Sequence, residues 1–233
     1  MKKGLLAGFI GLTLSGLAMA GHGEKPHAEP WTNATLAHTL KTMPEGNIQK
    51  GQALHVQMMC NSCHGEKGES PSRNYASLNG QTKEYTMKML LDYRDARRWE
   101  DYKQANIMVK LARVMSDQDI ADVAAFYAAQ ELSAWNVDSA PDARIDRLVA
   151  KGNANLMLTP CASCHGVHGE GNGITPAIAG QVPEYFIRTM KAYQEGHRNN
   201  DVHKGMSQFT HNLSEDDIKA LADYYARLPG GAK

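Results

Sequence analysis

Cysteine is scarce in this 233-residue chain: there are only four, and all of them lie in two short motifs. None lies near the amino terminus, so cleavage of an amino-terminal signal could not expose a cysteine for lipidation. The 25 basic and 25 acidic side chains balance, which argues against nucleic acid or a strongly anionic surface as partner. Aromatic residues make up only 7% of the chain. The apolar run from Leu5 to Leu17 is shorter than the roughly 20 residues that span a bilayer, which argues against a retained membrane anchor.

The two cysteine motifs are Cys60-Asn61-Ser62-Cys63-His64 and Cys161-Ala162-Ser163-Cys164-His165. Each is typical of a c-type haem attachment site, because two thiols on one helical turn can add to both vinyl groups of one haem. The adjacent histidine supplies an imidazole that suits iron. A zinc site would place its CxxC pairs roughly 15 to 20 residues apart. Here 97 residues separate the two CxxC pairs, so zinc or a disulfide remains only a minor alternative.

The first 20 residues are typical of a secretory signal peptide. A basic start, Met1-Lys2-Lys3, precedes the apolar run, and Ala18-Met19-Ala20 matches a cleavage site. We therefore expect cleavage after about Ala20 and export to the bacterial periplasm, which agrees with the haem motifs because c-type haem is attached on that side of the membrane. Loss of Lys2 and Lys3 leaves 23 basic against 25 acidic residues, a net charge of −2.

The second half of the chain repeats the first. Cys60 falls on Cys161 at an offset of 101, Gly80-Gln81 on Gly180-Gln181 at 100, and Ser116 on Ser214 at 98. A duplicated domain of about 85 residues explains the pattern, and a domain this small buries little core by itself. The predicted organisation is a signal peptide (1–20), an extended leader (21–47), a first domain (48–133), a linker (134–147) and a second domain (148–233).

Both copies are predicted to be mostly helical. One helix leads into each motif, from about Ile48 to Met59 and from about Asp146 to Leu158, and a middle helix follows each Gly-Gln pair, with Pro183 in the first turn of the second. The last helices begin at capping-box spacings. Their apolar stripes are predicted to be core: Ile120, Val123, Ala124 and Tyr127, then Ile218, Leu221, Ala222 and Tyr225. The fold class is therefore all-α.

Smaller features add expectations. Gly51 and Gly152 are predicted to let each first helix approach the last, with generic helix-entry glycines as the alternative. In the leader, Trp31 and Leu36 are expected to attach the chain to the first domain. The leader also contains three histidines, His22, His27 and His38. A solvated tail is expected there, with a metal site as the alternative. Trp135, in the polar linker, is expected to be an ordinary half-buried tryptophan, with packing at the domain junction as the alternative.

Together, the two CxxCH motifs, the Gly-Gln pairs and the Ser-x-x-Asp caps within residues 48 to 229 resemble the dihaem cytochromes c4. That resemblance implies two tandem class I cytochrome c domains about a pseudo-twofold axis, two covalent haem c groups with histidine and methionine ligands, and periplasmic electron transfer. The haems would supply much of the apolar core, which explains the few aromatic residues. One departure concerns the backbone carbonyl that orients the ligand histidine, because Pro176 of the second copy is replaced by Ala76 in the first.

If both irons are closed, meaning that a side chain fills the position opposite each ligand histidine, a methionine must follow His64 and another must follow His165 to serve as those ligands. Met206 is the only methionine after Met190 and is expected in a loop before the last helix. In the first copy Met108 and Met115 compete, but the offset of 98 aligns Met108 with Met206, so Met108 is the predicted ligand and Met115 is predicted core. Thioether ligation raises the reduction potential.

The expected function is that of an electron carrier, with no catalytic residue. We expect it to connect an upstream donor complex or dehydrogenase with a membrane-bound haem-copper terminal oxidase or a reductase; loose membrane association stays open. An electron-accepting subunit of an oxidoreductase, such as a sulfide dehydrogenase, is the alternative. A dihaem enzyme is disfavoured. A peroxidase needs an iron with an open position, whereas both copies here offer a methionine ligand, and a cysteine-ligated thiosulfate dehydrogenase needs a free cysteine, whereas all four cysteines here are assigned to haem.

Overall fold

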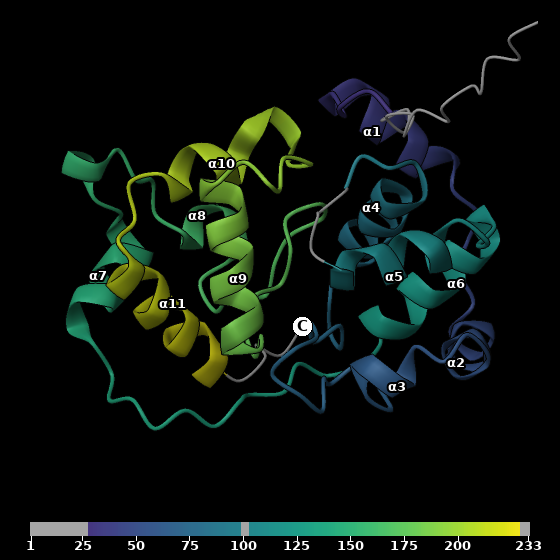
Figure 1. Cartoon of the computed structure of the whole chain (residues 1–233), viewed down its shortest axis with the longest axis horizontal. Coiled ribbons are helices and arrows are strands. Elements are labelled where there is room, and N and C mark those ends of the chain that lie inside the picture. Colours follow the sequence, from purple (N-terminus) through teal and green to yellow (C-terminus); the bar gives the residue numbers. More distant parts are fainter. Residues whose placement is uncertain (1–27, 99–102, 229–233) are drawn as a thin grey trace, which may run out of the picture.

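The computed structural model describes residues 28–98 and 103–228, and every regular element within these ranges is helical. Figure 1 shows two groups of helices side by side along the long axis of the molecule. The first group contains α1 (Asn33–Thr42), α2 (Ile48–Gln57), α3 (Asn61–His64), α4 (Lys83–Arg94), α5 (Lys103–Ala112) and α6 (Asp117–Ala128). The second contains α7 (Ala143–Lys151), α8 (Ala162–His165), α9 (Pro183–Gln194), α10 (Gly205–Thr210) and α11 (Glu215–Arg227). The all-α prediction is confirmed.

The core of the first domain is built around α6, which packs against α2 and α4. The predicted stripe from Ile120 to Tyr127 is buried, and Met87 and Leu91 of α4 face it in the same apolar cluster. In the second domain α11 packs against α9 and α7 in the same way. Its stripe from Ile218 to Tyr225 is buried against Phe186 and other apolar side chains. Both stripes are core, as predicted.

Reciprocal capping boxes begin both last helices, as their sequences predicted. The Ser116 hydroxyl accepts from the backbone N–H of Asp119 at 3.1 Å, and the Asp119 carboxylate accepts from the N–H of Ser116 at 2.9 Å. Ser214 and Asp217 form the same two bonds, at 3.1 Å to the hydroxyl and 3.2 Å to the carboxylate. Burial acts to raise the pKa of Asp217, yet the hydrogen bonds from Arg144 of α7 and from Ser214 outweigh it and lower that pKa.

The glycine prediction is confirmed for Gly51 and wrong for Gly152. A Cβ atom on Gly51 would lie 2.0 Å from the carbonyl oxygen of Asp122, so only glycine lets α2 approach α6 this closely. Gly152 instead ends α7 with a φ of 68°, and a Cβ there would meet the backbone of Leu158 rather than α11. A glycine in this left-handed conformation stops the helix, which explains why α7 does not run to the second motif.

The second copy's first helix therefore differs from the prediction at both ends. It begins at Ala143, where Asp142 caps it by accepting from the N–H of Arg144 at 2.8 Å, and a separate 3-10 turn covers 154–156. The last part of the predicted linker (134–147) is thus helical, while 131–142 have no regular structure. Trp135 is half-buried, as expected, and its N–H donates to the carbonyl of Ala226 at 2.7 Å.

The leader (21–47) is not simply extended, because α1 lies within it. The helix begins at a capping box formed by Thr32 and Thr35. Leu36 is buried, and Trp31 packs on the first core and donates from Nε1 to the Asp92 carboxylate at 2.5 Å. Tertiary packing thus stabilises a segment that lacks clear apolar periodicity. Trp31 and Leu36 do attach the leader to the first domain, as expected.

Some predictions fall on residues that the structure does not describe. The expected signal peptide (1–20), His22 and His27 lie outside the described residues. Across the helices of 28–98 and 103–228, none combines the length and the apolar character needed to cross a membrane.

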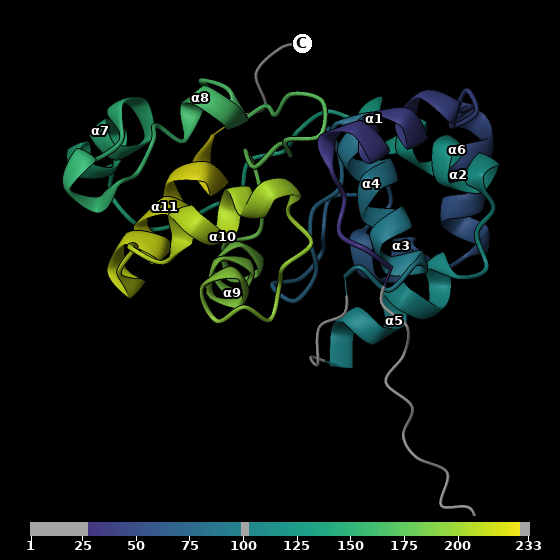
Figure 2. The same cartoon turned by 90° about the horizontal axis from the view of Figure 1, so that it is seen from above.

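The two domains meet through the segments that precede α4 and α9. Side chains of each segment hydrogen-bond to the backbone of the other, including Thr82 Oγ1 to the carbonyl of Gly173 at 2.6 Å. Figure 2 shows the same two helix groups from above, with α2 and α7 again at opposite ends of the long axis. The helix α4 also takes part in the junction, because Lys88 Nζ donates to the Asn200 carbonyl at 2.8 Å and Arg198 donates to the Tyr85 hydroxyl at 3.0 Å. The motif-bearing helices α3 and α8 belong to separate domains.

Candidate haem sites

The first CxxCH motif forms one helical turn. Cys60 precedes α3, and the backbone N–H of His64 donates to the Cys60 carbonyl at 2.9 Å. Cys60 and Cys63 are free thiols, as are Cys161 and Cys164 of the second motif, so the disulfide alternative is not what the structure shows. Burial raises the pKa of the Cys60 thiol. Both thiols of each turn are available for thioether bonds.

A backbone carbonyl fixes the orientation of the first histidine. Nδ1 of His64 lies 2.8 Å from the carbonyl oxygen of Ala76. An N–H at Nδ1 leaves Nε2 with the lone pair that a metal needs. Burial lowers the pKa of His64, outweighing the opposite effect of the hydrogen bond to Ala76, and so favours the neutral imidazole. Ala76 therefore replaces proline at this position without loss of the orienting bond.

The second histidine is held in the same way. The turn of α8 places Nδ1 of His165 2.9 Å from the carbonyl oxygen of Pro176, and burial lowers the pKa of His165. Each domain thus presents a CxxCH turn whose histidine is oriented and held through Nδ1, and burial favours the neutral form of both imidazoles. Within the described residues no group of three or more histidine, cysteine or acidic side chains is placed to hold a metal ion, so the zinc alternative finds no ligand set there.

A tyrosine from the last helix lies beside the first cysteine of each motif. Burial raises the pKa values of Tyr127 and Tyr225, and the neighbouring thiols of Cys60 and Cys161 add to the effect. The loop after each motif packs directly on these rings, because a Cβ on Gly68 or Gly169 would lie about 3 Å from them. From the sequence both tyrosines were predictable only as core residues, because their contact with the motif depends on the packing of α6 and α11.

His55 is a further buried residue that the sequence analysis did not identify. Its Nδ1 lies 2.9 Å from the Tyr127 hydroxyl, and its Nε2 lies 2.9 Å from the Gly65 carbonyl oxygen. It thereby joins the last helix of the first domain to the end of the CxxCH turn. The offset of 101 pairs it with Leu156, so the repeat gave no signal for it.

The candidate methionine ligands lie on short helices in front of the last helix of each domain. Met108 on α5 is half-buried between two apolar clusters, whereas Met115 is buried in the first core, as predicted. Met206 lies on α10 and not in the expected loop. It is half-buried against the second core, which Cys161 also contacts. Ligation by Met108 and Met206 stays a prediction.

Large apolar side chains are exposed beside both motifs. In the first domain Val56 is 58% and Met59 68% exposed; in the second, Met157 is 78% and Val167 70% exposed. Exposed apolar residues that gather around a functional group are typical of contact surfaces. Each CxxCH turn therefore has its own apolar rim.

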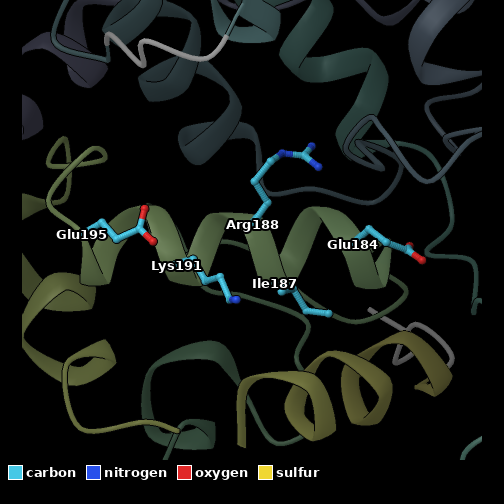
Figure 3. Close-up of a pocket in the computed structure, with 5 residues that line it drawn as sticks. All are labelled: Glu184, Ile187, Arg188, Lys191 and Glu195. Atoms are coloured by element: carbon cyan, nitrogen blue, oxygen red, sulfur yellow. The ribbon is translucent and has the colours of Figure 1, made fainter. Parts of the chain in front are cut away.

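A pocket of about 270 Å³ lies elsewhere, along one face of α9 (Figure 3). Ile187 is its one apolar residue, and charged side chains form the rest of its lining. Two of them contact the first domain: Arg188 donates to the Asn74 carbonyl at 2.8 Å, and Glu184 pairs with Arg73. None of the CxxCH or candidate methionine residues lines this pocket.

Comparison with known proteins places both halves of the chain in one family. The cytochrome c family model matches residues 48–129 and 149–228. Cytochrome c4 of Pseudomonas aeruginosa is 32% identical over 197 residues, which cover 83% of this chain and 94% of that protein. A thiosulfate dehydrogenase electron acceptor of Stutzerimonas stutzeri is 28% identical, covering 85% and 94%. The crystal structure of reduced cytochrome c4 from Pseudomonas stutzeri aligns with a TM-score of 0.70 at 29% identity, covering 78% and 99%.

Two helical domains, each with free thiols on one turn and a histidine oriented through Nδ1, fit covalent haem and define a dihaem c-type cytochrome. The chain belongs to the dihaem cytochrome c4 family. The predictions of two tandem cytochrome c-like domains and two covalent haem c groups are thereby confirmed. Its class of activity is electron transfer.

Proposed function

We propose that this chain carries single electrons in the periplasm between a respiratory donor and a membrane-bound haem-copper terminal oxidase. The export signal predicted in residues 1–20 supports this location. Haem c supplies a one-electron couple, and the protein sets its potential through the axial ligands. The proposal assigns no catalytic residue.

The ligand sets that we propose are His64 with Met108 and His165 with Met206. Cys60 and Cys63 form the thioether bonds in the first domain, and the second motif does the same in its domain. A soft thioether at the sixth position favours ferrous iron and raises the potential. If these side chains hold the two irons, neither iron would keep a free position for a substrate.

The observation that carries the proposal is the pair of apolar rims. Val56 lies on α2, in the first helix group, and Met157 ends the 3-10 turn 154–156 that comes after α7, in the second. Figures 1 and 2 show α2 and α7 at opposite ends of the molecule. Partners that dock at separate ends do not compete for one surface. Electrons would enter through one domain and leave through the other after exchange across the junction.

The formal charge does not distinguish the two ends. Residues 21–134 contain 13 basic and 14 acidic side chains, and residues 135–233 contain 10 and 11, so both halves come to −1. Docking at either end is therefore expected to depend on apolar contact more than on long-range steering.

Stopped-flow oxidation tests the proposal. The reduced protein is mixed with membranes that contain a haem-copper oxidase, and both haems are followed optically. Oxidation of both haems is expected, whereas peroxide or thiosulfate should not be turned over at enzymatic rates. Turnover of either substrate, without oxidation by any such membrane, would refute the carrier function. Fractionation of the expressing cells tests the periplasmic location.

A second function is favoured by one relative, the thiosulfate dehydrogenase electron acceptor of Stutzerimonas stutzeri. On this alternative the chain accepts electrons from a sulfur-compound dehydrogenase, as a docked subunit and not as a free carrier. Reduction of the purified protein by such a dehydrogenase and its substrate, together with co-elution of the two, would favour the alternative. Reduction without co-elution is expected of a free carrier.

A further inference from the structure

Two glutamines connect the domains reciprocally. Gln81 of the first domain accepts from the backbone N–H of Ala177 at 2.7 Å and donates to the Ala177 carbonyl at 3.0 Å. Gln181 of the second domain accepts from the N–H of Ser77 at 2.9 Å and donates to the Ser77 carbonyl at 3.0 Å. Each side-chain amide therefore pairs with both polar groups of one residue in the other domain.

These pairs reach the groups that orient the ligand histidines. The N–H of Ser77 and the carbonyl of Ala76 belong to the same peptide group, and that carbonyl holds Nδ1 of His64. One amide plane thus lies between His64 on one side and Gln181 on the other. The second domain has the same sequence of contacts, from His165 through the Pro176–Ala177 peptide to Gln81.

Burial and a second hydrogen bond fix both glutamine side chains. Gln81 is 6% and Gln181 8% exposed. Each Oε1 also accepts from the backbone N–H of the residue just before its own middle helix, Thr82 or Val182, at 2.9 Å. A buried amide with three satisfied bonds has one orientation, and loss of any of these bonds leaves a buried polar group unpaired.

We infer that each glutamine positions the ligand histidine of the opposite domain and so sets the reduction potential of the opposite haem. Gln181 acts on the first haem through the Ala76–Ser77 peptide and His64, and Gln81 acts on the second haem through Pro176 and His165. This inference rests on the proposed electron-transfer function and its histidine ligands. It gives the Gly-Gln repeats a role beyond the start of the middle helices.

The direction of the effect follows from the polarity of the peptide group. When Ser77 N–H donates to Gln181, electron density on the Ala76 carbonyl increases, and the carbonyl accepts more strongly from His64. A stronger bond at Nδ1 makes the imidazole a better electron donor to the metal. Ferric iron is thereby stabilised, so the glutamine holds the potential of the opposite haem down.

A redox titration that resolves the two haems tests the inference. In Gln181→Leu the reduction equilibrium constant of the first haem is expected to rise about threefold, or about 28 mV at about 59 mV per tenfold for one electron. The second haem should change much less. Gln81→Leu should give the mirror image, with the rise at the second haem. Haem methyl resonances in NMR report each iron separately.

Two further variants separate positioning from simple attachment of the domains. Gln181→Glu keeps an accepting oxygen for Ser77, so the first haem's potential should not rise. Thr82→Val removes the interdomain bond to Gly173 and the side-chain cap on the N–H of Tyr85, but it keeps the backbone N–H that donates to Gln81 and touches neither histidine-bearing peptide. Neither haem should therefore show the rise.

Equal shifts at both haems in Gln181→Leu, a shift confined to the second haem, or no shift would overturn the inference. So would a Thr82→Val variant that reproduces the Gln181→Leu pattern. None of these results would affect oxidation of the wild-type protein by oxidase membranes, so failure of this inference is distinguishable from failure of the carrier function.

Discussion

Replacement of the two candidate methionines in the first domain separates ligation from packing. Met115 is 7% exposed within the cluster that includes Leu91 and Ile120, so Met115→Ala should leave a cavity and cost about 2–5 kcal/mol of unfolding free energy. Met108 is only half-buried, so Met108→Ala should lose about 1 kcal/mol of apolar burial. Loss of the Met108 thioether should nevertheless open the first iron to an added ligand.

The assay combines carbon monoxide difference spectra of the reduced protein with denaturant unfolding. Met108→Ala should bind one carbon monoxide per chain at the first haem, whereas Met115→Ala should bind none and unfold at lower denaturant. Met206→Ala provides the matched control, because it should open only the second haem. Carbon monoxide binding by Met115→Ala but not by Met108→Ala would refute the alignment of Met108 with Met206.

Three other substitutions test the packing. Gly51→Ala should destabilise the first domain by about 1–3 kcal/mol in denaturant unfolding, because the new Cβ overlaps the backbone of α6. Gly205→Ala is the control and should not destabilise the protein, because open space surrounds Gly205. Equal destabilisation by the two substitutions would contradict the close approach of α2 and α6. The folded pKa of Asp217 is lowered, so its stabilisation is present above about pH 4 and is lost as the pH falls through that folded pKa. Asp217→Asn should therefore flatten the acid limb of a curve of stability against pH and cost about 1 kcal/mol of unfolding free energy at pH 7. An unchanged acid limb would refute the assignment. Asp92→Asn leaves the buried ammonium of Lys88 without its carboxylate and should lower the unfolding free energy by about 3–5 kcal/mol, measured by thermal or denaturant unfolding. A loss below about 1 kcal/mol would contradict the buried pairing.

Features that depend on neighbouring residues in the chain were predictable from the sequence. The CxxCH turns, the capping boxes at Ser116 and Ser214, and the apolar stripes of the last helices follow from spacings of three or four residues. Their physical causes are local, because one helical turn brings such residues together. Pro183 at the start of α9 belongs to the same class.

Features that depend on tertiary contact were missed or wrong. The helix in the leader is stabilised by burial of Leu36 and by the bond between Trp31 and Asp92, 61 residues away. Gly152 has the same place in the repeat as Gly51, yet its positive φ makes it a helix stop. The glutamine pairs connect residues about 100 positions apart, and a sequence shows that Gly-Gln recurs but not what its side chains contact.

The central claim is that both irons are closed and serve only to carry electrons. A reductive titration of the purified wild-type protein under carbon monoxide tests it most directly. The account predicts uptake of two electrons per chain, both haems with the ferrous spectrum of histidine–methionine ligation, and no carbon monoxide adduct at neutral pH. A carbon monoxide adduct at either haem, or uptake of a single electron, would contradict it.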